Sequence, residues 1–140
     1  MKTFTQNHTI MFSDCDNAQI VFYPNYFQWF DRATQNMFNK VGLPWSKMWP
    51  QYDIAGIPLV DAQSKFIAPL RMEDEIVIET WVEDWSGKVG TVRHNIIKDD
   101  FIHVEGTESL EGVVASVDVH ATMLSENVAI NGGGGGCSLS

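Results

Sequence analysis

Residues 14–41, DCDNAQIVFYPNYFQWFDRATQNMFNKV, decide how the rest of this 140-residue chain is arranged. Their first half is a short acidic loop, and their second half repeats apolar residues at the spacing of one helix face. Pro24 suits a first helical turn, where its missing N–H group costs nothing, and Gly42 followed by Pro44 is a typical stop. We therefore predict a helix from Pro24 to Val41 that starts directly after a loop rich in carboxylates.

The apolar stripe of this helix is wider than a surface helix needs. Its members are Tyr26, Phe30, Ala33, Met37 and Val41, with Phe27, Trp29 and Phe38 beside them. We expect such a helix to be enclosed on most of its circumference, and one sheet covering it would explain the stripe. The aromatic residues are interpreted as core residues without a cofactor role.

Strand patterns flank the helix on both sides in the sequence. Thr3 to Phe12 alternates, with Phe4, Ile10 and Phe12 on one side, and Leu43 to Ile57 is interpreted as an irregular connection with room for a helical turn. Segments rich in Val, Ile, Thr and aromatic residues follow at Leu59–Ile67, Glu75–Trp85, Val89–Lys98 and Phe101–Gly106, and a final strand is expected at 113–119. Short turns between consecutive strands indicate antiparallel pairing. The predicted order is a strand, a long helix and a meander of strands.

Length and composition indicate one compact domain. Apolar residues make up 44% of the chain and include eight Phe and five Trp, which is enough to build a core. Glycines fill 132–136, which is typical of a mobile segment. We expect a single domain over residues 1–130 and a flexible glycine-rich tail over residues 131–140.

The charge balance limits the partners that this chain can bind. Nine basic and eighteen acidic residues give a net charge of −9, which argues against nucleic acid or an anionic membrane as the principal partner. The sequence contains no apolar run of signal-peptide or membrane-span length. Cys15 and Cys137 lie in unrelated contexts and do not form a disulfide framework. These features predict a soluble, cytoplasmic protein without membrane partners.

The junction between the acidic loop and the helix is the candidate site of chemistry. First-turn amides and the positive end of the helix dipole can hold an oxyanion, and Asp16 is close enough in sequence to act on the carbon that carries it. Asp14 and Asp16 could equally form a solvated turn without function. Metal-ligand spacing, G-x-S-x-G, P-loop and G-x-G-x-x-G motifs are missing from the sequence, so no metal site is predicted.

Four stretches resemble the 4-hydroxybenzoyl-CoA thioesterase family of hotdog-fold enzymes. They read SDCDNAQIVFYPNYFQWFDRATQNMF, GLPW, GIPLVDAQSKFIAPLRMEDEIVIET and DWSGKVGTVRH, and the likeness extends from about Phe4 to Gly106. The resemblance implies an α+β hotdog fold, in which an antiparallel sheet wraps around a long central helix. It also implies homodimers formed by joining two sheets edge to edge, often paired again into tetramers, with active sites between subunits.

The resemblance also assigns roles to individual residues. Asp16 corresponds to the catalytic carboxylate, as nucleophile or general base, and the backbone N–H of Tyr23 to the oxyanion donor. Asp31 and Trp45 match positions that face the acyl group. The residues Lys88 and Arg93, with His94, lie on the strand pair where the family binds the phosphates of coenzyme A. The chain departs from the family at Gln19, where glycine is common, and at Ser86-Gly87-Lys88, where relatives often carry adjacent basic residues.

The function implied by these residues is hydrolysis of a small acyl- or aroyl-CoA thioester. A thiolate leaves readily, so a carboxylate and one or two amides can suffice without a triad. Coenzyme A belongs to the substrate, and no separate cofactor is expected. The alternative is a hotdog module that binds an acyl thioester, or assembles into oligomers, without catalysis.

Overall fold

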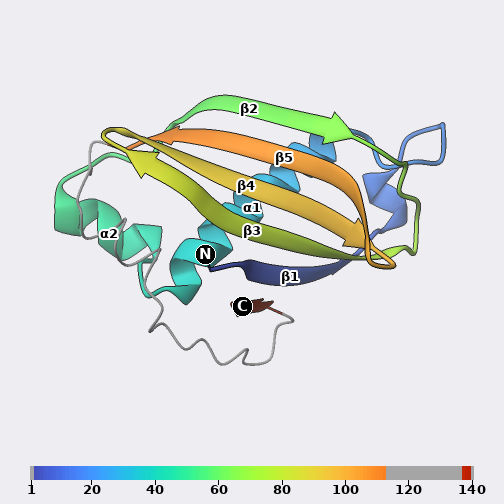
Figure 1. The fold of residues 1–140 in the computed structure, drawn as a ribbon, viewed down its shortest axis with the longest axis horizontal. Coiled ribbons are helices and arrows are strands. Elements are labelled where there is room, and N and C mark those ends of the chain that lie inside the picture. The colour runs from blue at the N-terminus through green and yellow to red at the C-terminus, as the bar shows by residue number, and fades with distance from the viewer. Residues whose placement is uncertain (1, 113–136, 140) are drawn as a thin grey trace.

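The computed structural model describes residues 2–112 and 137–139, which form one antiparallel sheet and two α-helices. The sheet has six strands in the order β2-β5-β4-β3-β1-β6, and α1 crosses one of its faces (Figure 1). The elements are β1 (Phe4–Thr9), the 3₁₀ helix η1 (Phe12–Asp14), α1 (Pro24–Lys40), α2 (Trp45–Tyr52), β2 (Leu59–Phe66), β3 (Glu75–Ser86), β4 (Val89–Lys98), β5 (Phe101–Glu111) and β6 (Cys137–Leu139).

The core lies between α1 and the sheet face that it crosses. Phe30 and Phe38 of α1 are fully buried, and they meet alternate residues of the central strands, such as Val92 and Ile96 of β4. Alternation is expected because successive side chains of a strand point to opposite faces. The antiparallel sheet laid over one long, apolar helix confirms the predicted α+β architecture.

Most predicted elements agree with the structure, and three differ. The first strand ends at Thr9, and Phe12 lies in η1 with 81% of its surface exposed, because the Met11 amide donates to the Asp14 side chain and turns the chain. The expected irregular connection contains α2, which buries Met48 against the core. Strand β5 continues beyond Gly106 to Glu111.

Gly106 explains why β5 is longer than predicted. The glycine does not interrupt the strand but makes room for the helix, because a Cβ atom at this position would overlap the ring of Phe30. The residue therefore allows α1 to lie close to the sheet.

Part of the expected tail belongs to the sheet. Cys137–Leu139 form β6, which pairs with Phe4, Thr5 and Gln6 of β1, so these three residues differ from the expectation of a flexible segment. Backbone hydrogen bonds to the free edge of β1 account for this placement. Residues 131–136 and the expected strand at 113–119 lie outside the described residues, and the division at residue 130 stays a prediction.

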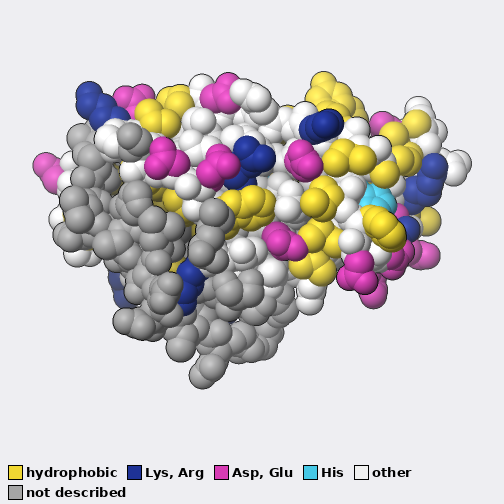
Figure 2. All heavy atoms as spheres, in the orientation of Figure 1, with side chains coloured by type: hydrophobic (Ala, Val, Ile, Leu, Met, Phe, Trp, Pro, Cys, Tyr) yellow, Lys and Arg dark blue, Asp and Glu magenta, His cyan; other side chains and the backbone are white. Residues whose placement is uncertain are grey.

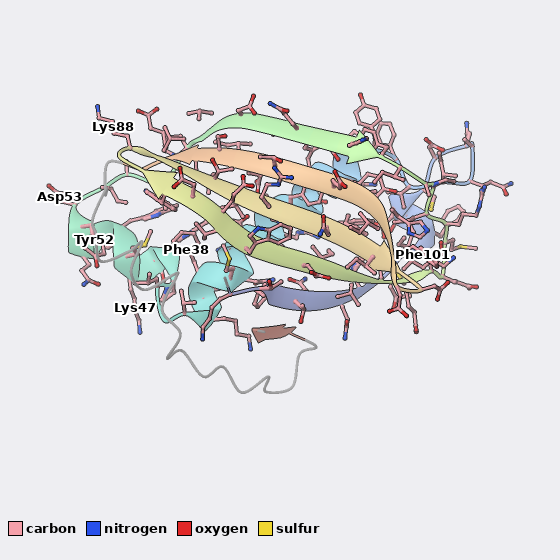
Figure 3. The ribbon with its side chains drawn as sticks, in the orientation of Figure 1. Phe38, Lys47, Tyr52, Asp53, Lys88 and Phe101 are labelled. Carbon is pink, nitrogen blue, oxygen red and sulfur yellow. The ribbon has the colours of Figure 1, made fainter. Side chains whose placement is uncertain are left out.

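The sheet face opposite α1 is mixed in character. Figure 2 shows charged side chains scattered over it, with hydrophobic side chains gathered toward the end away from α2. Phe101 lies at that end and is 72% exposed (Figure 3). Within residues 2–112 and 137–139, neither α-helix is long and apolar enough to cross a membrane.

Replacing Gly106 with alanine is expected to destabilise the fold by roughly 1–3 kcal/mol, because the added methyl group overlaps the Phe30 ring. Urea unfolding measures the change. Gly42→Ala is the contrast, since its new Cβ has no atom within 4 Å, so any cost there comes from its φ of +82° and not from overlap. Combining Gly106→Ala with Phe30→Leu should cost less than the sum of the two single changes, and strict additivity would contradict the packing argument.

Candidate active site

Asp14 fastens the acidic loop to the start of α1. Its carbonyl oxygen accepts hydrogen bonds from the Phe22 amide at 2.9 Å and from Nδ2 of Asn25 at 2.8 Å. Its carboxylate accepts from the Met11 amide at 2.9 Å and lies 3.4 Å from Nε2 of His8. Asp14 thus has a structural role in holding the loop against the start of α1.

Asp16 is held by a turn of its own. Its Oδ1 accepts the Ala18 amide at 2.8 Å, and its backbone pairs with Gln19 and Ile20 at 2.9 and 3.0 Å. The side chain is exposed on a cavity of about 590 Å³. The cavity is lined by Phe12, Cys15, Asp16, Asn17, Gln19, Arg71 and Met72.

The turn beside Asp16 has the backbone geometry that a glycine would favour. Gln19 adopts a φ of +64°, which costs a residue with a side chain of the order of 1 kcal/mol. Its carbonyl oxygen receives a hydrogen bond of 3.4 Å from Nη1 of Arg71. The departure from the family at position 19 therefore leaves the turn intact.

Tyr23 stands at the start of α1 and lines a cavity other than that of Asp16. Tyr23 precedes Pro24 as the N-cap of α1, and the first turn of the helix contains no acidic residue. Among the described residues, no hydrogen bond occupies the Tyr23 N–H, although its neighbour Phe22 is bonded to Asp14. Asp16 and Tyr23 thus belong to one locally braced segment, with a carboxylate and an unpaired helix amide.

Asp31 and Trp45 line a second cavity of about 690 Å³ between α1, α2 and the start of β2. Other walls come from Thr34, Trp49, Ile54, Ile57, Leu59 and Leu110. Burial raises the pKa of the Asp31 carboxyl, and the negative charge of Glu108 raises it further, while Arg32 opposes the shift. The structure brings Asp31 and Trp45 together, as the resemblance implies, but in a different cavity from Asp16.

The cavity around Asp31 contains polar donors that the protein leaves unused. The indole N–H groups of Trp45 and Trp49 are buried and have no hydrogen-bond partner among the described residues. Their rings stack with centroids 5.7 Å apart. Unpaired buried donors are costly, and these two lie beneath the cavity surface rather than on it.

The three residues expected near the coenzyme phosphates are separated. Lys88 lies in the turn between β3 and β4, at the α2 end of the sheet (Figure 3), while the acidic loop lies at the opposite end (Figure 1). Arg93 points to the outer sheet face, where Nη1 is 3.6 Å from Oε2 of Glu83. His94 points inward and is buried, so it cannot contact a phosphate in solvent.

Sequence reasoning missed a buried polar cluster behind the second cavity. Oε1 of Glu108 lies 2.6 Å from the Thr34 hydroxyl and 2.7 Å from Nε2 of His94, and Nδ1 of His94 lies 2.8 Å from the Thr80 hydroxyl. The alternation of inward and outward residues along the strands could have revealed this cluster, because His94 and Glu108 occupy inward positions of β4 and β5. Polar residues at such positions mark a functional or structural network.

Cys15 is unsuited to act as the nucleophile. Burial raises the pKa of its thiol, and the neighbouring carboxylate of Asp14 raises it further. The thiolate is the reactive form, so the surroundings suppress its reactivity.

Known proteins resemble this chain in both sequence and structure. A model of the thioesterase-like superfamily matches residues 10–131. The 4-hydroxybenzoyl-CoA thioesterase of Pseudomonas sp. (strain CBS-3) is 36% identical over 96 residues, which cover 68% of each protein. The putative acyl-CoA thioesterase YneP of Bacillus subtilis (strain 168) is 26% identical over 78 residues, or 56% of this chain and 55% of that protein.

Solved structures support the same relationship. A gentisyl-coenzyme A thioesterase superimposes with a TM-score of 0.76 at 30% identity, covering 85% of this chain and 98% of that one. The Pseudomonas 4-hydroxybenzoyl-CoA thioesterase gives a TM-score of 0.73 at 32% identity, covering 79% and 84%. These matches confirm the hotdog fold and the resemblance to 4-hydroxybenzoyl-CoA thioesterases. The chain therefore belongs to the thioesterase-like superfamily, as a hotdog-fold thioester hydrolase.

Proposed function

We propose that this protein hydrolyses a small acyl- or aroyl-CoA thioester at the junction of the acidic loop and α1. The observation that carries the proposal is the pairing of an exposed carboxylate, Asp16, with the unpaired amide of Tyr23 on one braced segment. The relatives named 4-hydroxybenzoyl-CoA and gentisyl-coenzyme A thioesterase support an aromatic acyl group.

Hydrolysis requires a nucleophile and a stabilised oxyanion. Asp16 attacks the thioester carbonyl to give an acyl-carboxylate anhydride that water cleaves, or it takes a proton from the water that attacks directly. In both routes the thiolate of coenzyme A leaves, and the acyl group departs as a carboxylic acid. The Tyr23 N–H donates to the carbonyl oxygen while negative charge develops on it. No cofactor beyond coenzyme A itself enters these steps.

The acyl group is assigned to the cavity of Asp31 and Trp45, and the phosphates to Lys88 and Arg93. Within one subunit, Lys88 and the acidic loop lie at opposite ends of the sheet (Figure 1). One substrate can therefore contact both only if Lys88 and the acidic loop come from two different subunits.

Strand β2 provides an edge suited to that second subunit. It pairs with β5 on one side, and its Leu59, Val60 and Phe66 are about half exposed. Among the described strands none pairs with its other side, and the unused backbone groups of such an edge can pair with another chain. We therefore propose a homodimer joined at this edge, with further pairing into a tetramer as an extension. A cytoplasmic location remains an expectation from the sequence.

Asp16→Asn is expected to reduce the kcat of acyl-CoA hydrolysis by at least about 100-fold, since a neutral amide neither attacks the carbonyl nor accepts a proton. Following free thiol release over a panel of acyl-CoAs gives the measurement. Asp100→Asn, in the exposed turn after β4, is the matched control. Parent-like turnover by Asp16→Asn would refute the mechanism, and a parent that is stabilised by acyl-CoA without releasing thiol would be the non-catalytic module.

Asn25→Ala is expected to lower kcat about tenfold and change KM little, because it removes the hydrogen bond that ties α1 to Asp14. Steady-state kinetics separate the two parameters, and thermal unfolding checks the fold. Asn39→Ala, at the exposed end of the same helix, controls for helix propensity. Equal kcat values for the two variants would remove the positioning role of Asn25.

Lys88→Gln is expected to raise KM for acyl-CoA about fivefold, the effect of losing one exposed phosphate contact. The matching N-acetylcysteamine thioester lacks the nucleotide, so its KM should not change. Lys47→Gln on α2 is the control, since Lys47 is also exposed near that end of the molecule (Figure 3). An equal effect on both thioesters would show that Lys88 acts otherwise than through the phosphates.

A further inference from the structure

The loop that carries Asp16 ends in a short tip, residues 16–19, which is shaped by hydrogen bonds of its own. The Asp16 amide donates to the Ile20 carbonyl at 3.0 Å, and the Gln19 amide donates to the Asp16 carbonyl at 2.9 Å. The Ala18 amide donates to Oδ1 of Asp16 at 2.8 Å. These bonds define the turn, but they join loop residues to one another and do not fasten the tip to the rest of the protein.

The turn before β3, residues 71–74, is in contrast fixed to the sheet. The Glu73 amide donates to the Ile10 carbonyl at 2.7 Å, and the Ile10 amide donates to the Asp74 carbonyl at 2.9 Å. Nζ of Lys98 lies 3.1 Å from Oδ1 of Asp74. A side chain that extends from this turn therefore starts from a well-anchored backbone.

Arg71 connects the anchored turn to the tip of the loop. Its Nη1 donates to the Gln19 carbonyl oxygen at 3.4 Å, and both residues line the cavity that holds Asp16. Among the residues that the structure describes, the other hydrogen bonds of positions 16–19 stay within the loop. Arg71 is thus the hydrogen-bonded link between the tip and the body of the protein.

Gln19 is the residue of the tip that most needs such a link. Its φ of +64° is a left-handed conformation, in which a side chain crowds the backbone. Glycine adopts the same conformation without this cost. With glutamine at position 19, conformations in which the turn has opened compete better with the native one. A hydrogen bond to the Gln19 carbonyl from outside the loop favours the native turn.

The Arg71 guanidinium bonds to the backbone of the loop and leaves the carboxylate of Asp16 unpaired. Among the described residues, no ion pair joins Arg71 to Asp16. A guanidinium is always charged, and charged donors form stronger hydrogen bonds than neutral ones. Because this bond is long and its donor is exposed, its effect is modest rather than large.

We propose that Arg71 is a positioning residue, which holds Asp16 in place by clamping the strained carbonyl of Gln19. The inference rests on the proposed function, because it takes Asp16 as the reacting carboxylate. It also makes a specific claim about coupling between two side chains. The clamp matters because position 19 is strained, so a glycine at that position should make Arg71 largely dispensable.

A double-mutant cycle tests this coupling. Arg71→Met removes the donor but keeps an apolar stem, so it should lower the kcat of acyl-CoA hydrolysis about fivefold and change KM little. In a Gln19→Gly background the same substitution should lower kcat less than about twofold. Lys47→Met is the control with unchanged kcat, since it removes one exposed positive charge at the α2 end (Figure 3).

The cycle separates positioning from the other ways in which Arg71 could act. A direct effect of its charge on the reaction would be the same in both backgrounds, so an equal loss of kcat with Gln19 and with glycine overturns the proposal. A loss confined to KM would make Arg71 a substrate contact and also overturns it. Thermal unfolding checks that the variants are folded, which we expect because Arg71 is exposed.

Amide hydrogen exchange tests the clamp without relying on catalysis. The amides of Asp16, Ala18 and Gln19 are hydrogen-bonded in the tip, so they should exchange about fivefold faster in Arg71→Met. Adding Arg71→Met to Gln19→Gly should change their exchange less than about twofold. Unchanged exchange in Arg71→Met overturns the proposal.

The two measurements also distinguish failure of the inference from failure of the proposed function. If the parent releases no thiol from any thioester, the proposed function fails by itself. Faster exchange at the tip in Arg71→Met then still supports the clamp, and unchanged exchange refutes it. If the parent is active, faster exchange without any loss of kcat overturns the positioning role.

Discussion

The close packing of α1 against the sheet is the constraint on which the other features depend. Phe30 and Phe38 are fully buried in the face that the sheet covers, and Gly106 of β5 makes the approach of Phe30 possible. Because the helix is rigid, its packing places its N-terminus at one end of the sheet and Asp31 beside the acyl cavity. The start of α1 and Asp31 are thus positioned by one buried element, while the loops around it complete the cavities.

The same packing encloses a polar cluster that a purely apolar core would not need. Apolar residues of similar volume at positions 34, 94 and 108 could match or exceed its contribution to stability, because desolvating charged groups is expensive. A network of this kind is satisfied only if all members are present, as the short contacts of Glu108 with Thr34 and His94 show. Its place behind Asp31 links an energetic cost in the core to the electrostatic character of the cavity.

One chain carries the parts of the proposed site in separate places. Asp16 and Tyr23 belong to the loop and helix start, Asp31 and Trp45 to the second cavity, and Lys88 to the far turn. Leu59 is the first residue of β2, the edge strand of the described sheet, and it also lines the second cavity. A subunit joined at that edge would therefore lie beside the acyl cavity, which connects the proposed assembly to the chemistry.

The sequence alone determined the features that arise from neighbouring residues. The limits of α1 follow from Pro24 and from the Gly42 stop, and Asp16 and Tyr23 stand seven positions apart on one loop and helix start. The antiparallel strands were likewise predictable from local alternation. Only a helical turn was expected where the eight-residue α2 lies, since this helix is stabilised by burying Met48 rather than by a local pattern.

Tertiary structure decided what depends on strand register and on contacts between distant positions. Thr34 and Glu108 are 74 positions apart, and only the pairing of β4 with β5 and the packing of α1 bring both to His94. Register also decided that Arg93 faces outward while His94 faces the core, since a shift by one residue exchanges the two faces. The acidic loop beside the helix start was therefore predictable from the chain, whereas the contacts among Thr34, His94 and Glu108 exist only in the folded protein.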